Sequence, residues 1–362
     1  MINWFLLFLT SLLSFNQEVK PKPQRYLYVA VPGVRNYLEY GGHGILVFDM
    51  DNDHKLVKRI PTHGIAPDGT PENVKGVDVS LATQCIYITT IHGLQCIDLK
   101  TEKIKWEKSF DKGCDRLSIS PDGKEIYVPS FEKEDWYIID ALKGDIKLTI
   151  SPNIKAHNTT YSPDGKEIYL EGLQSPYLTV VSAMNPTETR QVGPFSNMIR
   201  PFTINRSQTR VYVNANELLG FEIGDLKSGR KISSTVVSGY EKGPVKRHGC
   251  PSHGIALNPG ETEIWISDAY NQKLHVFDLK NDQVNQKTSI PVKDQPGWIT
   301  FSLNGQYAYP STGEVIDAKS KKIITNLKDE NGNMVGSEKM LEIDFMDGKA
   351  VSMGDQFGLG RK

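Results

Sequence analysis

The sequence predicts an all-β fold, a seven-bladed β-propeller built from four-stranded antiparallel blades. An aromatic–aliphatic pair recurs seven times, mostly at intervals of about 40–45 residues, the length of one propeller blade. The runs between turns are short and rich in Val, Ile, Thr and Tyr, and no stretch has the periodicity of an amphipathic helix. The seven pairs are Tyr28-Val29, Tyr87-Ile88, Tyr127-Val128, Tyr169-Leu170, Tyr212-Val213, Trp265-Ile266 and Tyr307-Ala308.

The chain begins with a segment unlike the rest. Residues Trp4 to Phe15 carry no charge, and a polar, proline-containing stretch follows them. This length is too short to cross a bilayer and is typical of the apolar part of a secretory signal, although Met1 to Asn3 include no basic residue. We expect a signal peptide at 1–18, a linker at 19–25 and the propeller at 26–362, in a periplasmic or secreted protein without a stable membrane anchor. The alternative is a buried N-terminal strand or helix.

The composition argues against nucleic acid as a partner. The chain has 42 basic and 43 acidic side chains in 362 residues, a net charge of −1, and so lacks the overall basic charge of nucleic-acid-binding proteins. We expect a monomer that binds a small molecule or an oligosaccharide. The four cysteines, Cys85, Cys96, Cys114 and Cys250, form no CxxC motif, and we expect mostly free, buried thiols.

Each repeat unit contains four strands. In the fourth unit we expect them at residues 158–162, 167–172, 177–183 and, more weakly, 189–193. The sequence SPDG at 162–165 supplies the turn between the first two strands, because Pro, Asp and Gly each favour tight turns. The third strand of a unit often ends in Asp, as at Asp140 and Asp278.

The two ends of the propeller complement each other. The first aromatic pair, at Tyr28, has no inner strand before it, whereas an unpaired strand-like run lies at 341–345. The simplest closure has this C-terminal strand complete the first blade, which removes open sheet edges. The residues after it, 349–362, have no predicted place.

Three stretches carry a family resemblance: SPDGKEIYV, SPDGKEIYL and HGIALNPGETEIWISDAYNQKLHVFDL. They resemble the YVTN-repeat seven-bladed propellers, which are related to the cytochrome d1 and lactonase propellers, over about residues 26 to 346. The resemblance implies the fold and leaves the function open, since this fold hosts unrelated activities.

Alternation along the innermost strands predicts which side chains face the central channel. One set is apolar and should pack between blades, as at Val77 and Val79. The set between these positions is small or polar, and we expect it to face a channel that holds water. Its members are Asp78, Ser118, Thr160, Thr203, Ala256 and Thr300.

The entrance of each inner strand differs from blade to blade, which scaffold positions in a repeat should not do. We therefore expect these side chains to form a ring around one mouth of the channel, while the alternative is a polar rim that only keeps this face soluble. The entrance residues are Lys75, Asp115, His157, Arg200, His253 and Gly297, and the next residues include Arg116, Asn158 and Trp298.

Histidines and long loops gather on the same face. Loops before the inner strand and loops between the second and third strands share one face of a propeller, which places six of the eight histidines there. Two insertions, at 62–76 and 238–254, also open on it, and long loops in compact folds are often functional. The six histidines are His43, His63, His92, His157, His248 and His253.

A basic, His-rich ring suits an anionic sugar. Arginine binds carboxylates through two parallel hydrogen bonds, and histidine can accept or donate protons near neutral pH. We expect β-elimination or dehydration of a uronic-acid-containing oligosaccharide, with Arg or Lys neutralising the carboxylate. The expected catalytic residues are His157, His253, Arg200 and Tyr270. The expected substrate-binding residues are Lys75, Asp115, Arg116, Asn158, His248, Trp298, His43 and His63.

Two alternatives stay open. One is a periplasmic propeller that binds a partner without chemistry. The other is a metal-dependent, lactonase-like hydrolase, in which His157, His253 and His248 would hold Zn²⁺ or Mn²⁺. The sequence thus predicts either no cofactor or a divalent metal.

Overall fold

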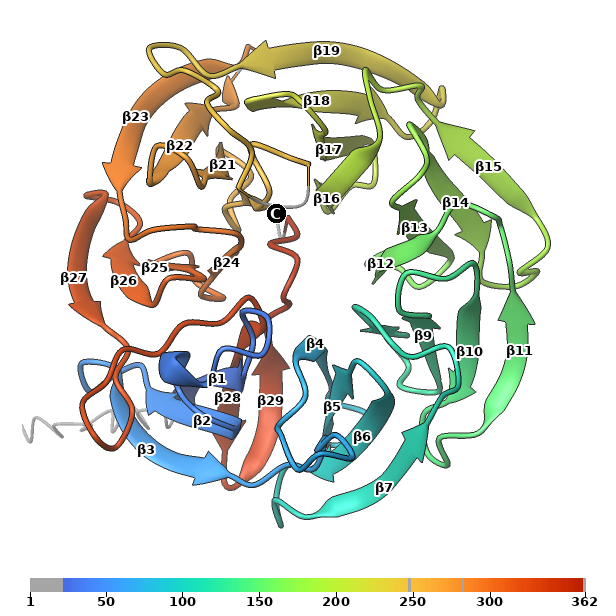
Figure 1. Cartoon of the computed structure of the whole chain (residues 1–362), viewed down its shortest axis with the longest axis vertical. Coiled ribbons are helices and arrows are strands. Elements are labelled where there is room, and N and C mark those ends of the chain that lie inside the picture. The colour runs from blue at the N-terminus through green and yellow to red at the C-terminus, as the bar shows by residue number, and fades with distance from the viewer. Residues whose placement is uncertain (1–21, 247–248, 281–282, 361–362) are drawn as a thin grey trace, which may run out of the picture.

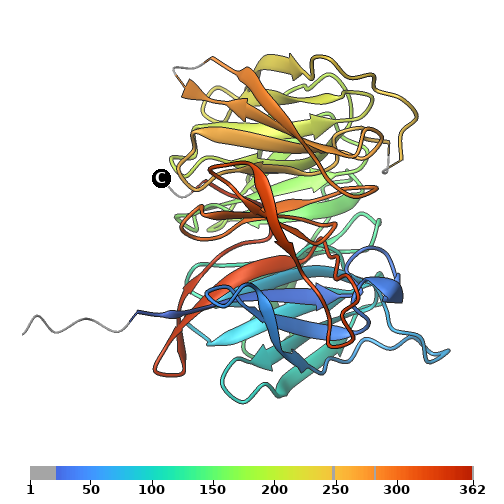
Figure 2. The ribbon, with the colours of Figure 1, turned by 90° about the vertical axis from the view of Figure 1, so that its left-hand side faces the viewer.

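The computed structural model, which describes residues 22–246, 249–280 and 283–360, is a ring of seven antiparallel sheets around a central axis (Figure 1). The predicted seven-bladed propeller is confirmed. Each blade begins with a strand near the axis and ends with a strand at the rim. Figure 2 shows the same disc from its edge.

The strands follow one another blade by blade. Blade one holds β28 (Met340–Met346), β1 (Gln24–Val31), β2 (Gly44–Asp49) and β3 (Lys55–Ile60). Blade two is β4 (Val74–Ser80), β5 (Cys85–Thr90), β6 (Gly93–Asp98) and β7 (Ile104–Ser109), and blade three is β8 (Ser118–Ile119), β9 (Glu125–Pro129), β10 (Trp136–Asp140) and β11 (Ile146–Ile150). Blade four is β12 (Ala156–Tyr161), β13 (Glu167–Gly172), β14 (Leu178–Ser182) and β15 (Thr189–Val192).

The remaining three blades repeat the pattern. Blade five is β16 (Ile199–Ile204), β17 (Arg210–Ala215), β18 (Gly220–Asp225) and β19 (Arg230–Val236). Blade six is β20 (Ile255–Leu257), β21 (Glu263–Asp268), β22 (Lys273–Asp278) and β23 (Asn285–Pro291). Blade seven is β24 (Ile299–Phe301), β25 (Tyr307–Pro310), β26 (Glu314–Asp317) and β27 (Lys322–Asn326).

Blade one closes the ring as predicted. β28 pairs with β1, so that Leu341 lies opposite Tyr28 and the last part of the chain joins the first. β1 begins at Gln24, inside the segment expected as linker. A fifth strand, β29 (Lys349–Met353), pairs with the other side of β28. The first part of segment 349–362, for which the sequence predicted no place, thus extends the sheet of blade one.

The SPDG turns fix the hairpins between first and second strands. In blade three the Ser120 hydroxyl accepts the backbone N–H groups of Lys124 and Glu125 at 3.1 and 3.0 Å. Asp122 also accepts the N–H of Lys124, and Gly123 closes the turn at a φ of 71°. Glycine adopts this left-handed conformation without a steric penalty, which explains its place in the repeat.

Apolar side chains pack between neighbouring blades. Val77 and Val79 of blade two are fully buried in one cluster with Leu341 and Ile343 of blade one. The rim strands, in contrast, expose most of their side chains, as β11 does along its whole length. Since sheets buried on both faces must be apolar on both, the inner three strands carry the core.

The polar set of the inner strands joins blades instead of facing only water. The Asp78 carboxylate accepts the backbone N–H of Ile119 in the next blade at 2.9 Å. The Ser118 hydroxyl accepts the N–H of Tyr161 in the blade after that at 3.0 Å. Neighbouring backbone therefore satisfies part of this set, while Asp78, Ser118 and Thr160 also line a cavity of about 410 Å³.

The C-terminal segment 354–360 crosses the channel at the end opposite to the strand entrances (Figure 1). Thr203 and Thr300 donate hydrogen bonds to the carbonyls of Gly358 and Asp355, at 2.7 and 2.8 Å. The backbone N–H of Leu257 also binds the Gly358 carbonyl, at 2.9 Å. The C-terminal segment thus binds Thr203 and Thr300, two of the positions expected to face water.

Little helix accompanies the strands. A single turn of 3₁₀ helix, η1 (Leu38–Tyr40), lies in the loop between β1 and β2. In the part of the chain that the structure describes, no helix is long and apolar enough to cross a membrane. All four cysteines are buried and unbridged, as expected. The expected signal peptide at 1–18 lies outside the described residues.

Candidate functional site

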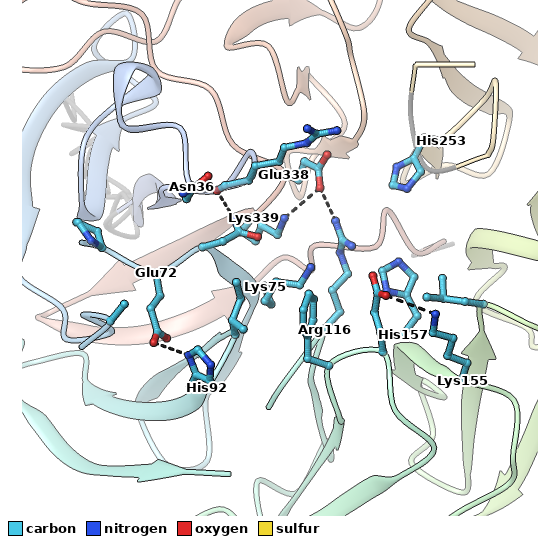
Figure 3. A pocket seen from close by; sticks show the side chains of 18 of the residues that line it. Asn36, Glu72, Lys75, His92, Arg116, Lys155, His157, His253, Glu338 and Lys339 are labelled. Atoms are coloured by element: carbon cyan, nitrogen blue, oxygen red, sulfur yellow. Dashed lines mark hydrogen bonds and ion pairs between the residues drawn. The ribbon is translucent and has the colours of Figure 1, made fainter. Parts of the chain in front are cut away.

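A cavity of about 720 Å³ opens where the entrances of the inner strands meet (Figure 3). Its volume lies within the range of about 300–1,000 Å³ that is typical of small-molecule sites. Five predicted site residues line it together: Lys75, Arg116, His157, Arg200 and His253. They come from blades two to six, so five neighbouring blades together form the cavity wall.

Register explains why these residues converge. In blades two to six the entrance residue lies three positions before the residue that pairs with the anchor aromatic, and in blade seven Gly297 lies three positions before Thr300, which pairs with Tyr309 instead of the anchor Tyr307. Thus Lys75 precedes Asp78, opposite Tyr87, and His157 precedes Thr160, opposite Tyr169. Because blades two to six repeat this register around one axis, the entrance side chains meet at one mouth.

A histidine–carboxylate pair forms the centre of the wall. His157 Nδ1 donates a hydrogen bond to Asp115 Oδ2 at 2.8 Å, although the two residues belong to neighbouring blades. Lys75 Nζ lies 3.6 Å from the other carboxylate oxygen, and Asp115 is fully buried. Burial alone would raise the pKa of Asp115, but Lys75, His157 and Arg116 outweigh it and hold this pKa well below its usual range.

This pairing fixes the tautomer of His157. A carboxylate can only accept, so neutral His157 carries its proton on Nδ1 and presents a lone pair on Nε2. Since His157 lines the cavity, Nε2 is the atom placed to take a proton from a bound molecule. Asp115 also accepts the N–H of Arg116 at 3.0 Å, which holds its carboxylate in place.

A second cluster joins blade three to blade one. Arg116 Nη2 donates to Glu338 Oε2 at 2.7 Å, and Lys339 Nζ donates to the same oxygen at 3.0 Å (Figure 3). The guanidinium of Arg116 lies 3.8 Å from the ring centroid of Trp298, a cation–π contact. Trp298 donates its indole N–H to the carbonyl of Gln356, so the C-terminal segment supports this wall.

Lys339 is an unusual member of the wall. It is buried with 2% exposure, and this burial, with help from Arg116 and Lys75 and against the opposing effect of Glu338, lowers the pKa of Lys339 to about 7. A buried lysine with a shifted pKa in a cavity is a candidate functional group.

Arg200 projects from blade five. Its Nε donates to Asn216 Oδ1 at 2.8 Å, and within the described residues no carboxylate forms an ion pair with it. Nearby, Asn158 donates to Glu171 at 2.6 Å and both side chains are fully buried. Burial raises the pKa of Glu171, and the positive charges of His157 and Arg200 oppose that rise. Asn158 therefore acts behind the wall and does not line it.

Two further histidines reach the cavity. His253 Nδ1 donates to the carbonyl of Gly297 at 3.0 Å, which again fixes the proton on Nδ1. His92 Nδ1 lies 2.6 Å from Glu72, whose other oxygen accepts the hydroxyl of Thr90. The first insertion thus brings Glu72 into the wall, whereas the described part of the second insertion contributes His253.

Other predicted site residues lie elsewhere. Trp298 is buried beneath Arg116, and Tyr270 is exposed away from the cavity lining. His43 Nε2 lies 3.2 Å from the carbonyl of His63, while His63 Nδ1 lies 2.7 Å from Glu107, and neither histidine lines the cavity. His248 lies outside the described residues. The aromatic ring in the wall is Phe131, which the sequence reasoning missed.

The metal hypothesis finds no ligand set here. Among the residues that the structure describes, no group of three or more His, Cys, Asp and Glu side chains could hold a metal ion. The histidines of the wall are instead each bound through Nδ1 to a carboxylate or a carbonyl.

Sequence reasoning also missed Glu338 and Lys339. Leu341 lies opposite Tyr28, so Glu338 occupies in blade one the entrance position that Lys75 occupies in blade two. Lys339 then matches Arg116, the second position of blade three. Extending the repeat alignment to the C-terminal strand was the signal that could have found them.

The comparisons with known proteins show the fold and little more. No protein-family model matches the chain, so membership of the YVTN-repeat family stays a prediction. A segment of 66 residues is 39% identical to Antigen Lp49 of Leptospira interrogans serogroup Icterohaemorrhagiae serovar copenhageni (strain Fiocruz L1-130). That match covers 18% of this chain and 13% of the antigen.

Solved structures resemble this chain across most of its length. Dihydro-heme d1 dehydrogenase NirN, in complex with DHE, superposes with a TM-score of 0.62 at 14% identity, over 91% of this chain and 73% of that one. The β-propeller domain of Cps50 (Swd1) from Myceliophteria thermophila superposes with a TM-score of 0.61 at 11% identity, over 78% of this chain and 96% of that one. At these identities the likeness concerns architecture, and the chain is a seven-bladed β-propeller.

Proposed function

We propose that this protein is an exported enzyme that cleaves or dehydrates a uronic-acid-containing oligosaccharide by β-elimination in the central cavity. The observation that carries the proposal is the His157–Asp115 pair beside Lys75 and Arg200 in one cavity. A base next to cations is what removal of a proton from carbon beside a carboxylate requires. Export rests on the apolar segment Trp4 to Phe15, and we propose a monomer.

Charge supports an anionic ligand. Basic side chains outnumber carboxylates in the cavity lining, and Asp115 lies behind the wall: the basic residues are Arg35, Lys75, Arg116, Lys155, Arg200 and Lys339, and the carboxylates are Glu72, Glu132 and Glu338. Arg200 has no ion-pair partner among the described residues, so a ligand carboxylate would give it one. A guanidinium can bind both carboxylate oxygens at once, which would orient the sugar ring as well as hold it.

The reaction needs a base and an acid. Arg200 and Lys75 would stabilise the negative charge that develops on the carboxylate when the C5 hydrogen leaves. His157 Nε2 would take that proton, the electron pair would form the C4–C5 double bond, and the C4–O bond would break. His253, when protonated, would return a proton to the leaving oxygen. Tyr270, also expected to be a catalytic residue, does not line the cavity.

The test is a screen of purified protein against uronate oligosaccharides, reading the ultraviolet absorbance of the new C4–C5 double bond and, in parallel, binding by calorimetry. The proposal predicts an absorbance rise with at least one of them, unchanged by a chelator. Binding without any absorbance rise would support instead a propeller that binds anionic sugars without chemistry. A rise that a chelator abolishes would support the metal-dependent alternative.

A further inference from the structure

We propose that Lys339 is a nucleophilic amine that forms a reversible imine with an aldehyde or ketone group of a carboxylate-bearing ligand in the central cavity. The inference rests on the proposed function in one respect, the assumption that the ligand carries a carboxylate. The reactive group and the bond that it forms are new.

Hydrogen bonding at the amine supports this chemistry. Lys339 Nζ has two acceptors, the Gly33 carbonyl at 2.9 Å and Glu338 Oε2 at 3.0 Å. A neutral amine has two N–H bonds and one lone pair, so these acceptors use its hydrogens and leave the lone pair. An ammonium group would carry a third hydrogen, and the described residues offer it no further acceptor within hydrogen-bond distance.

Charge balance in the wall favours the same form. Lys75, Arg116 and Lys339 share two carboxylates, Asp115 and Glu338. The carboxylates balance Lys75 and Arg116, so a charged Lys339 would leave an excess positive charge in a buried site, which is costly. Its lowered pKa agrees with this balance.

Position makes the amine accessible to a ligand. Lys339 lines the same cavity as Arg200 and His157, and Figure 3 shows it on the wall opposite His157 and next to Lys75. A ligand with a carboxylate and a carbonyl, such as the open-chain reducing end of a uronic acid, could meet a cation and this amine at once.

The chemical step balances without an oxidant or a reductant. The amine nitrogen attacks the carbonyl carbon, its two hydrogens pass to the carbonyl oxygen, and that oxygen leaves as water when the C=N bond forms. The imine draws electrons from the neighbouring carbon, so a proton on that carbon would become easier for His157 to remove.

The experiment traps the imine on the full-length protein. Wild-type protein is incubated at pH 7 with glyoxylate, which carries an aldehyde beside a carboxylate, and with cyanoborohydride, which reduces an imine to a stable amine. Peptide mapping then compares Lys339 with Lys155, a second cavity lysine, and with the exposed Lys124. Since an amine of pKa 7 has on the order of 10³ more neutral form at pH 7 than an ordinary lysine, we expect labelling of Lys339 at least about tenfold faster.

Two further arms sharpen the result. Glycolate, which has the carboxylate but no aldehyde, should slow the labelling of Lys339 and not that of Lys124. The variant Lys339→Arg keeps a long basic side chain and cannot form the imine, and Lys124→Arg is the control for the same exchange at the surface. Because the wild-type map gives the primary result, the test does not depend on whether Lys339→Arg folds.

The outcomes separate this inference from the proposed function. Labelling of Lys339 no faster than that of Lys124, or labelling that glycolate leaves unchanged, would overturn the inference. If glucuronate still binds by calorimetry in that case, the carboxylate site of the proposed function stands. If glucuronate does not bind either, the carboxylate site is overturned as well.

Discussion

Asp115 Oδ2 accepts a hydrogen bond from His157 Nδ1 at 2.8 Å across the boundary between blades three and four. This contact joins the entrance residues of two neighbouring blades. Because these residues differ, one being Asp and the other His, together they form a hydrogen-bonded acid–base pair. The carboxylate is fully buried and the imidazole faces the cavity. Neither blade alone could build the pair.

Asp115→Asn tests whether this contact orients the base. The amide has nearly the same shape but can donate a hydrogen bond, so it favours the wrong tautomer of His157. We expect kcat to fall by about 10²–10⁴-fold with a smaller change in KM. Circular dichroism should show an intact propeller, and an unchanged kcat in a folded variant would contradict the orienting role.

Arg200→Met tests the carboxylate site. Arg200 is the cation that has no ion-pair partner among the described residues. Its removal should weaken binding of a uronate oligosaccharide by about 10–100-fold, since a charged hydrogen bond contributes about 1.5–3 kcal/mol. Calorimetry measures the affinity directly. Arg230→Met, on the exposed rim strand β19, is the matched control and should bind normally. Equal affinities of the two variants would remove Arg200 from the site.

Asp344→Asn tests a titrating group far from the cavity. Burial, together with Glu342, raises the pKa of Asp344 to about 7, above the value of about 3.9 in an unfolded chain. The folded state therefore holds this proton more tightly, and the stabilisation is complete below about pH 4 and lost as the pH rises through about 7. We therefore expect the thermal unfolding temperature of the wild type to fall between pH 5 and pH 8 by a few degrees more than that of the variant.

The control for this prediction is on the same hairpin. Asp347 is exposed in the turn between β28 and β29, so Asp347→Asn should follow the pH curve of the wild type. Parallel curves for wild type and Asp344→Asn would show that the proton at Asp344 does not contribute to stability.

Phe357→Ala tests the C-terminal segment in the channel. Phe357 is 3% exposed and packs edge-to-face on Trp298 with ring centroids 6.2 Å apart. Its loss should lower the free energy of unfolding by about 3 kcal/mol and weaken ligand binding, because Trp298 supports Arg116. Urea unfolding and calorimetry measure the two effects, and Val351→Ala, at an exposed position of β29, should change neither. Loss of stability with full affinity would separate the segment from the site.

Repetition made the fold readable from the sequence. The recurring anchors gave seven blades, and the missing inner strand before Tyr28 with the orphan run at 341–345 gave the closure. The segment after β29 could not be placed, because its hydrogen bonds go to Thr203, Leu257 and Thr300 of other blades. Nothing in the local sequence of a non-repeating segment specifies such partners.

The site was readable only in part, for a related reason. Lys75, His157, Arg200 and His253 stand at one repeat position, so their convergence follows from the register. Glu338 and Lys339 lie at the same mouth of the channel, but they directly precede β28, the C-terminal strand, which the repeat alignment of inner strands did not include. Tyr270 lies on a loop, and Trp298 stands one position after the entrance residue of its blade, but side-chain packing, which the period does not encode, keeps both out of the cavity lining.

The initial rate of C4–C5 double-bond formation from a uronate oligosaccharide, compared between the wild type and His157→Gln, tests the central claim most directly. The account predicts a measurable rate for the wild type, a loss of about 10²–10⁴-fold in the variant, and retained binding and stability. His63→Gln, at an exposed histidine outside the cavity lining, should keep the wild-type rate. No rate in the wild type with any uronate, or equal rates in wild type and His157→Gln, would contradict the claim that His157 is the base of this propeller.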